Sequence, residues 1–240
     1  MANSIYALLS KQAGLRQQVD LIAHNVANLG TTGFKREGLT FAAHIERLAV
    51  PGRELALADA RASYTDFGAG PLARTGNPLD VAIEGDGHFA VETAAGVRYT
   101  RDGRFGLNEI GELVTAAGHR VLDEGGSPIL IPLEAAAIGI SRDGTLTAED
   151  GQPLGVLGLH RLPAGRILRA ADGLFAPEGE PEPALDVRLA QGFVEASNVN
   201  PIREITDLIE AQRAYERGRT MLDAEDARLR NMIQKLDQDA

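Results

Sequence analysis

Histidine is the residue type in this 240-residue chain best suited to bind a metal or carry a proton. Two histidines four residues apart on a helix can share a metal ion, and so can clusters of cysteine and histidine. The chain has no cysteine, and its histidines are scattered, with no two at that spacing: His24, His44, His88, His119 and His160. Because isolated histidines are usually polar surface residues, we expect no metal site, and without cysteine there is no disulfide.

Other motifs that would carry chemistry are also missing from the sequence. There is no G-x-x-x-x-G-K-[ST] phosphate loop and no G-x-S-x-G nucleophile turn. The glycine-rich stretches at 68–70 and 85–87 open no helical pattern, so we interpret them as turns. The numerous acidic residues follow no EF-hand spacing. We therefore expect no catalytic residue, no cofactor and no small-molecule substrate.

The charge and hydropathy of the chain argue against several partners. With 34 acidic and 24 basic residues the net charge is −10, and such a chain repels nucleic-acid phosphates. It has no basic run for an anionic membrane surface and no apolar stretch of the roughly 18 residues that span a membrane. Residues 1–11 lack the basic opening of a Sec signal peptide. Taken alone, these features predict a cytoplasmic protein.

A long amphipathic helix is predicted over residues 4–28. Its apolar residues recur at alternating steps of three and four, which is the seam of a heptad repeat, interrupted only by Gln12. A helix of this length is marginal in water, so its seam needs a partner. The apolar seam positions are Ile5, Leu8, Leu15, Val19, Ile22 and Val26.

A second helix is predicted over residues 201–236. Pro201 suits its first turn, and either Asn198 or Asn200 can cap it. Apolar residues then follow at intervals of seven: Leu208, Tyr215, Leu222, Leu229 and Leu236. Because each end of the chain carries a heptad helix that needs a partner, we expect the two helices to pair.

The middle of the chain, residues 76–195, is predicted to be all-β and antiparallel. Short alternating runs between turn residues are typical of sandwich-like or barrel-like domains. Asp-Gly pairs, a strong hairpin signal, separate many of these runs: Asp86-Gly87, Asp102-Gly103, Asp143-Gly144, Asp150-Gly151 and Asp172-Gly173. Residues 37–75 show little periodicity, and we interpret them as a long connecting loop.

A polar, glycine-rich stretch follows the first helix, and residues 23–36 are called the signature segment below. Asn25 and Asn28 can bond backbone groups where the helix stops, and Gly33 permits a left-handed backbone. Phe34 offers an apolar anchor after the turn. Composition alone favours an ordinary helix cap with a hydrophobic clamp.

The signature segment resembles that of the flagellar rod, hook and hook-associated axial proteins. The matching residues are Asn25, Ala27, Asn28, Thr32, Gly33, Phe34 and Lys35, while His24 stands where the family more often has Asn. Residues 191–200, with Asn198 and Asn200, and residues 209–216 are similar to the start and continuation of the family's last helix. Residues 85–89 and 99–105 resemble its β domain, and the opening Asn3–Tyr6 resembles proximal-rod members.

The resemblance implies an α+β fold. The terminal helices would form an α-helical coiled-coil inner domain, with an all-β antiparallel domain of the rod and hook type inserted between them. The domains would be residues 1–36, the connecting loop 37–75, the β-rich domain 76–195 and the last helix 196–240. The implied function is that of a structural, non-enzymatic subunit that assembles into the torque-transmitting proximal rod and so serves motility.

The resemblance also implies partners, a location and packing residues. The partners are copies of the chain, other rod proteins and the flagellar type III export apparatus, which would deliver the chain to the periplasm without a Sec signal. The residues implied to act in subunit packing are Ile5, Leu8, Leu15, Val19, Ile22, Asn25, Val26, Asn28, Thr32, Gly33, Phe34, Lys35, Asn198, Asn200, Leu208, Tyr215, Leu222 and Leu229.

Three alternatives stay open at this point. The chain could be a distal-rod or hook-type member of the same family. A secreted adhesin-like binding module would require aromatic platforms, whereas aromatic residues are only 5% of the chain and tryptophan is absent. A β-rich enzyme would require polar residues that converge in a cleft.

Overall fold

The computed structural model describes residues 2–47, 54–132, 138–163, 165 and 167–238. The chain forms two compact units, which we call the terminal unit and the β unit. The terminal unit comprises Met1–Leu29, Arg36–Phe67 and Val199–Ala240, and the β unit comprises Gly30–Lys35 and Gly68–Asn198. The boundary between them crosses the signature segment twice, after Leu29 and after Lys35.

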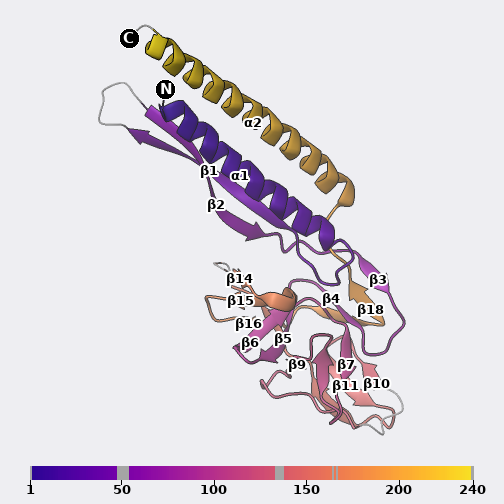
Figure 1. The fold of residues 1–240 in the computed structure, drawn as a ribbon. Coiled ribbons are helices and arrows are strands. Elements are labelled where there is room, and N and C mark those ends of the chain that lie inside the picture. The colour runs from indigo at the N-terminus through magenta and orange to yellow at the C-terminus, as the bar shows by residue number, and fades with distance from the viewer. Residues whose placement is uncertain (1, 48–53, 133–137, 164, 166, 239–240) are drawn as a thin grey trace. The chain divides into compact units, whose positions relative to one another are not determined.

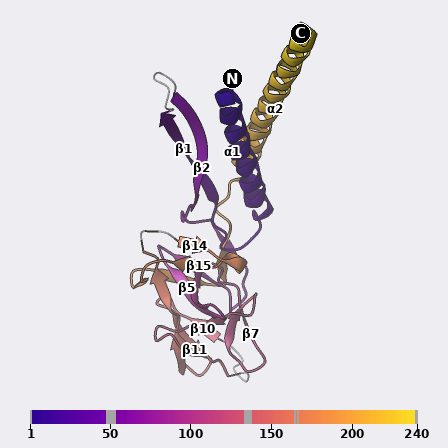
Figure 2. The ribbon, with the colours of Figure 1, turned by 60° about the vertical axis from the view of Figure 1, so that its left-hand side comes forward.

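Two long helices and one hairpin make up the terminal unit. Helices α1 (Ala2–Ala27) and α2 (Pro201–Gln238) run antiparallel. Strands β1 (Glu37–Arg47) and β2 (Glu54–Thr65) pair antiparallel, and α1 lies between this hairpin and α2 (Figure 1, Figure 2). Neither helix, over its described residues, is long and apolar enough to cross a membrane.

The contact between the two helices has a polar point at Gln12, the one break in the predicted seam. Gln12 Nε2 donates to the carbonyl oxygen of Tyr215 at 2.9 Å. Gly218 lies opposite, where an added Cβ would stand 2.8 Å from Gln12 Nε2. Glycine inside a helix costs about 1 kcal/mol relative to alanine, but here it leaves room for the glutamine. Because this partly buried hydrogen bond would be lost if the helices slid past each other, the pair favours one alignment of α1 along α2.

The predicted α-helical coiled-coil inner domain is wrong. Residues 37–47 and 54–65, interpreted from the sequence as part of a long loop, form β1 and β2, and this hairpin contacts α1. α1 therefore packs against a helix and a hairpin, which is not the geometry of a coiled coil. The hairpin escaped prediction because its second strand, ELALADARASYT, is rich in alanine and charge, and strand pairing overrides such weak local preference.

The β unit is built from short strands and a single 3-10 turn, η1 (Ala171–Gly173). The strands are β3 (Leu72–Arg74), β4 (Val81–Glu84), β5 (His88–Thr93), β6 (Gly96–Thr100), β7 (Phe105–Leu107), β8 (Leu113–Thr115), β9 (Arg120–Val121), β10 (Ile138–Ile140), β11 (Thr145–Ala148), β12 (Pro153–Val156), β13 (Leu159–Arg161), β14 (Ile167–Arg169), β15 (Phe175–Pro177), β16 (Glu182–Pro183), β17 (Arg188–Gln191) and β18 (Phe193–Glu195).

These strands pair antiparallel in four groups. One sheet of nine has the order β14-β15-β6-β5-β9-β8-β7, with β13 paired to β5 and β16 paired to β13. A three-stranded sheet has the order β10-β11-β12, and two ribbons pair β17 with β4 and β18 with β3. The two ribbons bring the segment before α2 alongside residues 72–84, more than 100 positions earlier in the chain.

Three of the Asp-Gly pairs lie in hairpin connections, and one of them, Asp172-Gly173, joins β14 to β15 within η1. Asp143-Gly144 connects β10 to β11, and Asp150-Gly151 connects β11 to β12. Both glycines have a positive φ, 93° and 79° respectively, which suits a tight hairpin turn. The pair Asp102-Gly103 has a different role: Gly103 lets its backbone lie close to that of Val81, because an added Cβ would overlap the carbonyl oxygen of Val81.

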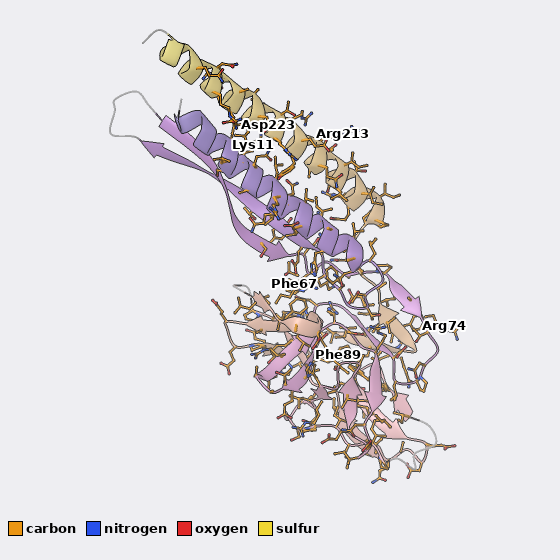
Figure 3. All side chains as sticks on the ribbon, viewed as in Figure 1. Lys11, Phe67, Arg74, Phe89, Arg213 and Asp223 are labelled. Carbon is orange, nitrogen blue, oxygen red and sulfur yellow. The ribbon has the colours of Figure 1, made fainter. Side chains whose placement is uncertain are left out.

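Aliphatic side chains dominate the core of the β unit. Phe89 and Phe105 meet edge to face with their ring centroids 5.0 Å apart, and Phe89 lies among the strands in Figure 3. The aliphatic residues around them include Val81, Ile83, Val91, Leu113, Val121, Ile129, Ile131, Leu146 and Leu157. This core supports the loops that hold the signature segment.

Candidate functional site

Asn25 joins the end of α1 to the start of β1 inside the terminal unit. Its side chain is fully buried. Asn25 Nδ2 donates to the carbonyl oxygen of Glu37 at 2.8 Å, and the amide of Glu37 donates to Asn25 Oδ1 at 3.0 Å. The side-chain amide thus bonds the backbone as a neighbouring strand would. Asn28 has a more local role, since its Nδ2 donates to the carbonyl oxygen of His24 at 2.9 Å and covers the helix end.

Glu204, on the first turns of α2, meets both Asn25 and Arg36 in the terminal unit. The carboxylate is fully buried and accepts from Arg36 Nε at 2.5 Å and from Asn25 Nδ2 at 3.2 Å. Burial acts to lower the pKa of Arg36, but the hydrogen bonds and charges of Glu204 and Tyr64 together outweigh it and raise this pKa above its ordinary value. The guanidinium therefore stays charged. We call Asn25, Arg36, Glu37 and Glu204 the terminal cluster.

Lys35 forms the centre of a second cluster, inside the β unit. Its side chain is completely buried, and Nζ donates to Glu195 Oε1 at 2.6 Å and to the carbonyl oxygen of Gly68 at 2.9 Å. The amide of Gly70 donates to the same Glu195 oxygen at 2.7 Å. A buried lysine keeps its charge only when it is paired and hydrogen-bonded, and both conditions are met here.

Arg101 places a second cation beside Glu195. Its Nε lies 3.6 Å from Glu195 Oε2, and its terminal nitrogens donate to the carbonyl oxygens of Ile83 and Gly85. Burial lowers the pKa of Arg101, and the charges of Glu195 and Asp86 oppose that effect. One buried carboxylate therefore faces two buried cations. We call Lys35, Arg101 and Glu195 the β cluster.

His88, at the start of β5, lies in the electric field of the β cluster. Burial, followed by the charges of Arg101 and Lys35, lowers the pKa of His88 to about 3. The imidazole is therefore neutral near pH 7. Its ring meets Phe175 edge to face, with centroids 5.8 Å apart. His88 thus behaves as a buried core residue of the β unit.

Gly33 and Phe34 fix the turn that delivers Lys35 to the β cluster. Gly33 has φ +67°, and a Cβ there would overlap the amide nitrogen of Asp102 and lie 2.5 Å from Arg101 C. The amide of Gly33 donates to the carbonyl oxygen of Glu195 at 2.7 Å. The ring of Phe34 is 4% exposed and lies beneath the guanidinium of Arg169, 4.2 Å from its centroid.

The two asparagines before α2 have separate roles. Asn198, in the β unit, donates from Nδ2 to the carbonyl oxygen of Gly68 at 2.9 Å. Asn200, in the terminal unit, is the helix cap, because its Oδ1 accepts from the amides of Ile202 and Arg203, each at 3.1 Å. Of the two caps considered from the sequence, the structure therefore uses Asn200.

The remaining sequence-predicted packing residues lie along the helices and the turn. Ile22 is buried, whereas the half-buried ones are Leu8, Leu15, Val19, Val26, Thr32, Leu208, Tyr215 and Leu222. The side chains of Ile5 and Leu229 lie outside the described residues. Sequence reasoning missed Glu204 altogether and quoted Arg101 and Glu195 only as parts of motifs. The only hint in the sequence was that one carboxylate, Glu195, lies shortly before the Ser-Asn-Val-Asn run and another, Glu204, shortly after it.

The β unit also has a surface cleft of about 730 Å³. Its charged lining residues, Glu124, Arg142, Asp143 and Arg188, are all exposed to solvent. Across the part of the chain that the structure describes, no group of three or more His, Cys, Asp or Glu could hold a metal ion.

Comparisons with known proteins give the class of this chain. Residues 82–148 match the model of the flagellar hook protein FlgE/F/G D1 domain, and residues 190–235 match that of the flagellar basal body rod FlgEFG protein C-terminal. The second match contains Glu195 and Glu204, the carboxylates of the two clusters. The chain belongs to the FlgE/F/G family of flagellar basal-body rod structural proteins.

Named relatives cover nearly the whole chain. The flagellar basal-body rod protein FlgF of Mesorhizobium japonicum is 42% identical over 220 residues, which is 90% of each chain. FlgF of Caulobacter vibrioides is 38% identical over 245 residues, or 98% of each chain. The basal-body rod protein FlgG of Agrobacterium fabrum is 35% identical over 228 residues, covering 82% of this chain and 86% of its own.

Proposed function

We propose that this chain is a subunit of the proximal part of the basal-body rod and assembles with copies of itself and with other rod proteins. The observation that carries the proposal is an apolar stripe at the start of α2. Ile202, Ile205 and Ile209 are 78%, 49% and 43% exposed. Their spacing of three and four places them on one helix face. Neighbouring exposed apolar side chains on one face mark a surface for a protein partner.

The stripe is separate from the face that α2 uses within its own chain. The buried residues near the start of α2 are Glu204 and Ala211. At 3.6 residues per turn they lie roughly opposite the isoleucines. Arg213 continues the outer side of α2 and projects away from α1 in Figure 3. Burying each isoleucine against a partner would contribute about 1.5–3 kcal/mol before ordering costs.

A second surface is needed for a polymer, because a heterologous contact joins two different patches. We propose that the half-buried seam residues of α1 and α2, such as Leu15, Val19 and Leu222, supply part of it. The buried signature residues would act differently, by holding the shape of the subunit that presents these patches. This role needs no catalytic chemistry, and we propose that the chain is not an enzyme.

The rod role also requires a route across the cytoplasmic membrane. We propose that the flagellar type III apparatus exports the chain to the periplasmic part of the basal body, with its N-terminal region as the signal. The support for this step is the family to which the chain belongs. Its partners beyond copies of itself would be the rod proteins above and below it.

Deletion and complementation in the source bacterium test both levels of the proposal. We expect the deletion to abolish swimming and the wild-type gene to restore it; a deletion strain that swims normally would refute the rod function. Ile205→Asp should fail to restore swimming although the chain folds, because Ile205 is half exposed. Ile205→Leu, which keeps the site apolar, is the matched control and should restore it. Normal swimming with Ile205→Asp would refute the stripe as a contact and leave the rod role standing.

A further inference from the structure

The signature segment makes contacts that an assembly surface does not explain. Within the β unit Lys35 is 0% exposed and Phe34 is 4% exposed, and Gly33 is buried against the backbone of Arg101. Within the terminal unit Asn25 is 0% exposed. A side chain without exposed surface cannot touch a neighbouring subunit while its own chain stays folded. These residues therefore act inside one chain.

The carboxylates that bind Lys35, Arg36 and Asn25 come from one short segment far along the sequence. Lys35 binds Glu195, 160 positions away, and Arg36 binds Glu204, 168 positions away. Asn25 also binds Glu204, at a separation of 179 positions. We infer that residues 33–36 form an intramolecular latch, which closes on residues 195–204 of the same chain and keeps both clusters folded only when that segment is in place.

In the β unit the latch depends on charge, because the buried cations need the carboxylate of Glu195. Without Glu195, the buried cations Lys35 and Arg101 would both lose the carboxylate that faces them. Removing one partner of a buried ion pair typically costs about 3–5 kcal/mol, because the remaining charge is left unpaired. That is a large part of the stability of a small domain, about 5–15 kcal/mol. The β unit therefore cannot close its signature turn until Glu195 arrives.

The terminal unit has a similar arrangement, but there the fully buried charge is an anion instead of a cation. There the fully buried group is the carboxylate of Glu204, to which Arg36 and Asn25 of the signature segment donate. An N-terminal part lacking residues 195–204 would close neither cluster. The latch thus makes completion of the chain a condition for stable folding of its N-terminal part. This inference concerns one chain by itself and does not depend on the proposed rod function.

Hydrogen exchange on the purified full-length chain tests the latch. In Glu195→Gln, we expect the amides of residues 33–35 and 68–70 to exchange at least tenfold faster than in the wild type. The control Glu210→Gln removes an exposed carboxylate from α2 and should leave these amides unchanged. Wild-type protection of these amides in Glu195→Gln would overturn the inference.

A double-mutant cycle on Arg36 and Glu204 keeps the test valid if the first variant does not fold. The unfolding constants of the wild type, Arg36→Met, Glu204→Gln and the double variant are measured at two protein concentrations a hundredfold apart. We expect a coupling of at least tenfold, equal at both concentrations, because the contact lies within one chain. A coupling below tenfold, or one that disappears on dilution, would overturn the inference, since a contact between chains weakens on dilution.

Discussion

Gly33→Ala should destabilise the β unit strongly. The residue has φ +67°, and a side chain in this left-handed region costs about 1–2 kcal/mol. The added methyl group would also overlap the amide nitrogen of Asp102 and lie 2.5 Å from Arg101 C. These are backbone atoms and cannot rotate away, so overpacking adds about 1–3 kcal/mol. The free energy of opening of the β unit should therefore fall by about 2–5 kcal/mol.

The assay is hydrogen exchange of the slowest amides in β5 and β6, which reports the free energy of opening of the β unit alone. Gly30→Ala is the matched control, because it lies in the same turn, has no positive φ, and has nothing within 4 Å of its added Cβ. The control should change the opening free energy by less than about 1 kcal/mol. If the two variants differed by less than that, the argument that Gly33 fixes the signature turn would fail.

Three further changes test the buried groups and the cap. The pKa of His88, about 3 when folded, is below its unfolded value near 6.5. Its contribution to stability is therefore complete above pH 6.5 and is lost as the pH falls, and the loss should reach roughly 3 kcal/mol at pH 4.5. Urea unfolding across pH 4.5–7.5 should show this loss in the wild type and a smaller one in His88→Gln. Phe34→Ala removes a buried ring beneath Arg169 and should cost about 3–5 kcal/mol in the same urea assay at pH 7.5. Asn200→Ala removes the cap of α2 and should cost about 1 kcal/mol, seen as faster exchange of the amides of Ile202 and Arg203.

Each of these changes has a control or an opposing outcome. For His88, equal pH slopes in the wild type and the variant would contradict a neutral buried imidazole. For Phe34, the control Leu185→Ala removes a side chain that is 87% exposed and should cost less than about 0.5 kcal/mol; comparable losses would contradict the anchoring role. Unchanged exchange in Asn200→Ala would mean that another group caps α2.

The two long helices were predictable because their periodic patterns are long and regular. The apolar seam over residues 4–28 lies on one helix, α1, and the apolar residues that recur every seven positions after Pro201 lie on another, α2. What the seam does not reveal is the kind of partner. A stripe of apolar residues packs against a hairpin as readily as against a helix, which explains the incorrect coiled-coil prediction. The hairpin of β1 and β2 was missed because β2 is rich in alanine and charge, although apolar residues alternate along β1 from Leu39 to Ile45.

The signature segment was found from the sequence, but the structural role of its residues was not. Gly33 and Phe34 could be assigned to a turn and an anchor, since these are local properties. The carboxylates that bind Lys35 and Arg36 lie 160 and 168 positions away, and no local pattern connects residues so far apart. Whether a charged residue is buried and paired depends on tertiary contacts, so Arg101 could not be distinguished from a surface arginine.

The central claim is that this chain is a subunit of the flagellar rod. The most direct measurement is to purify basal bodies from the source bacterium, remove hook and filament, and probe the rod fraction for this chain. The account predicts that the chain stays with the rod fraction and that its deletion removes the distal rod as well. Absence of the chain from purified basal bodies, together with normal swimming of the deletion strain, would contradict it.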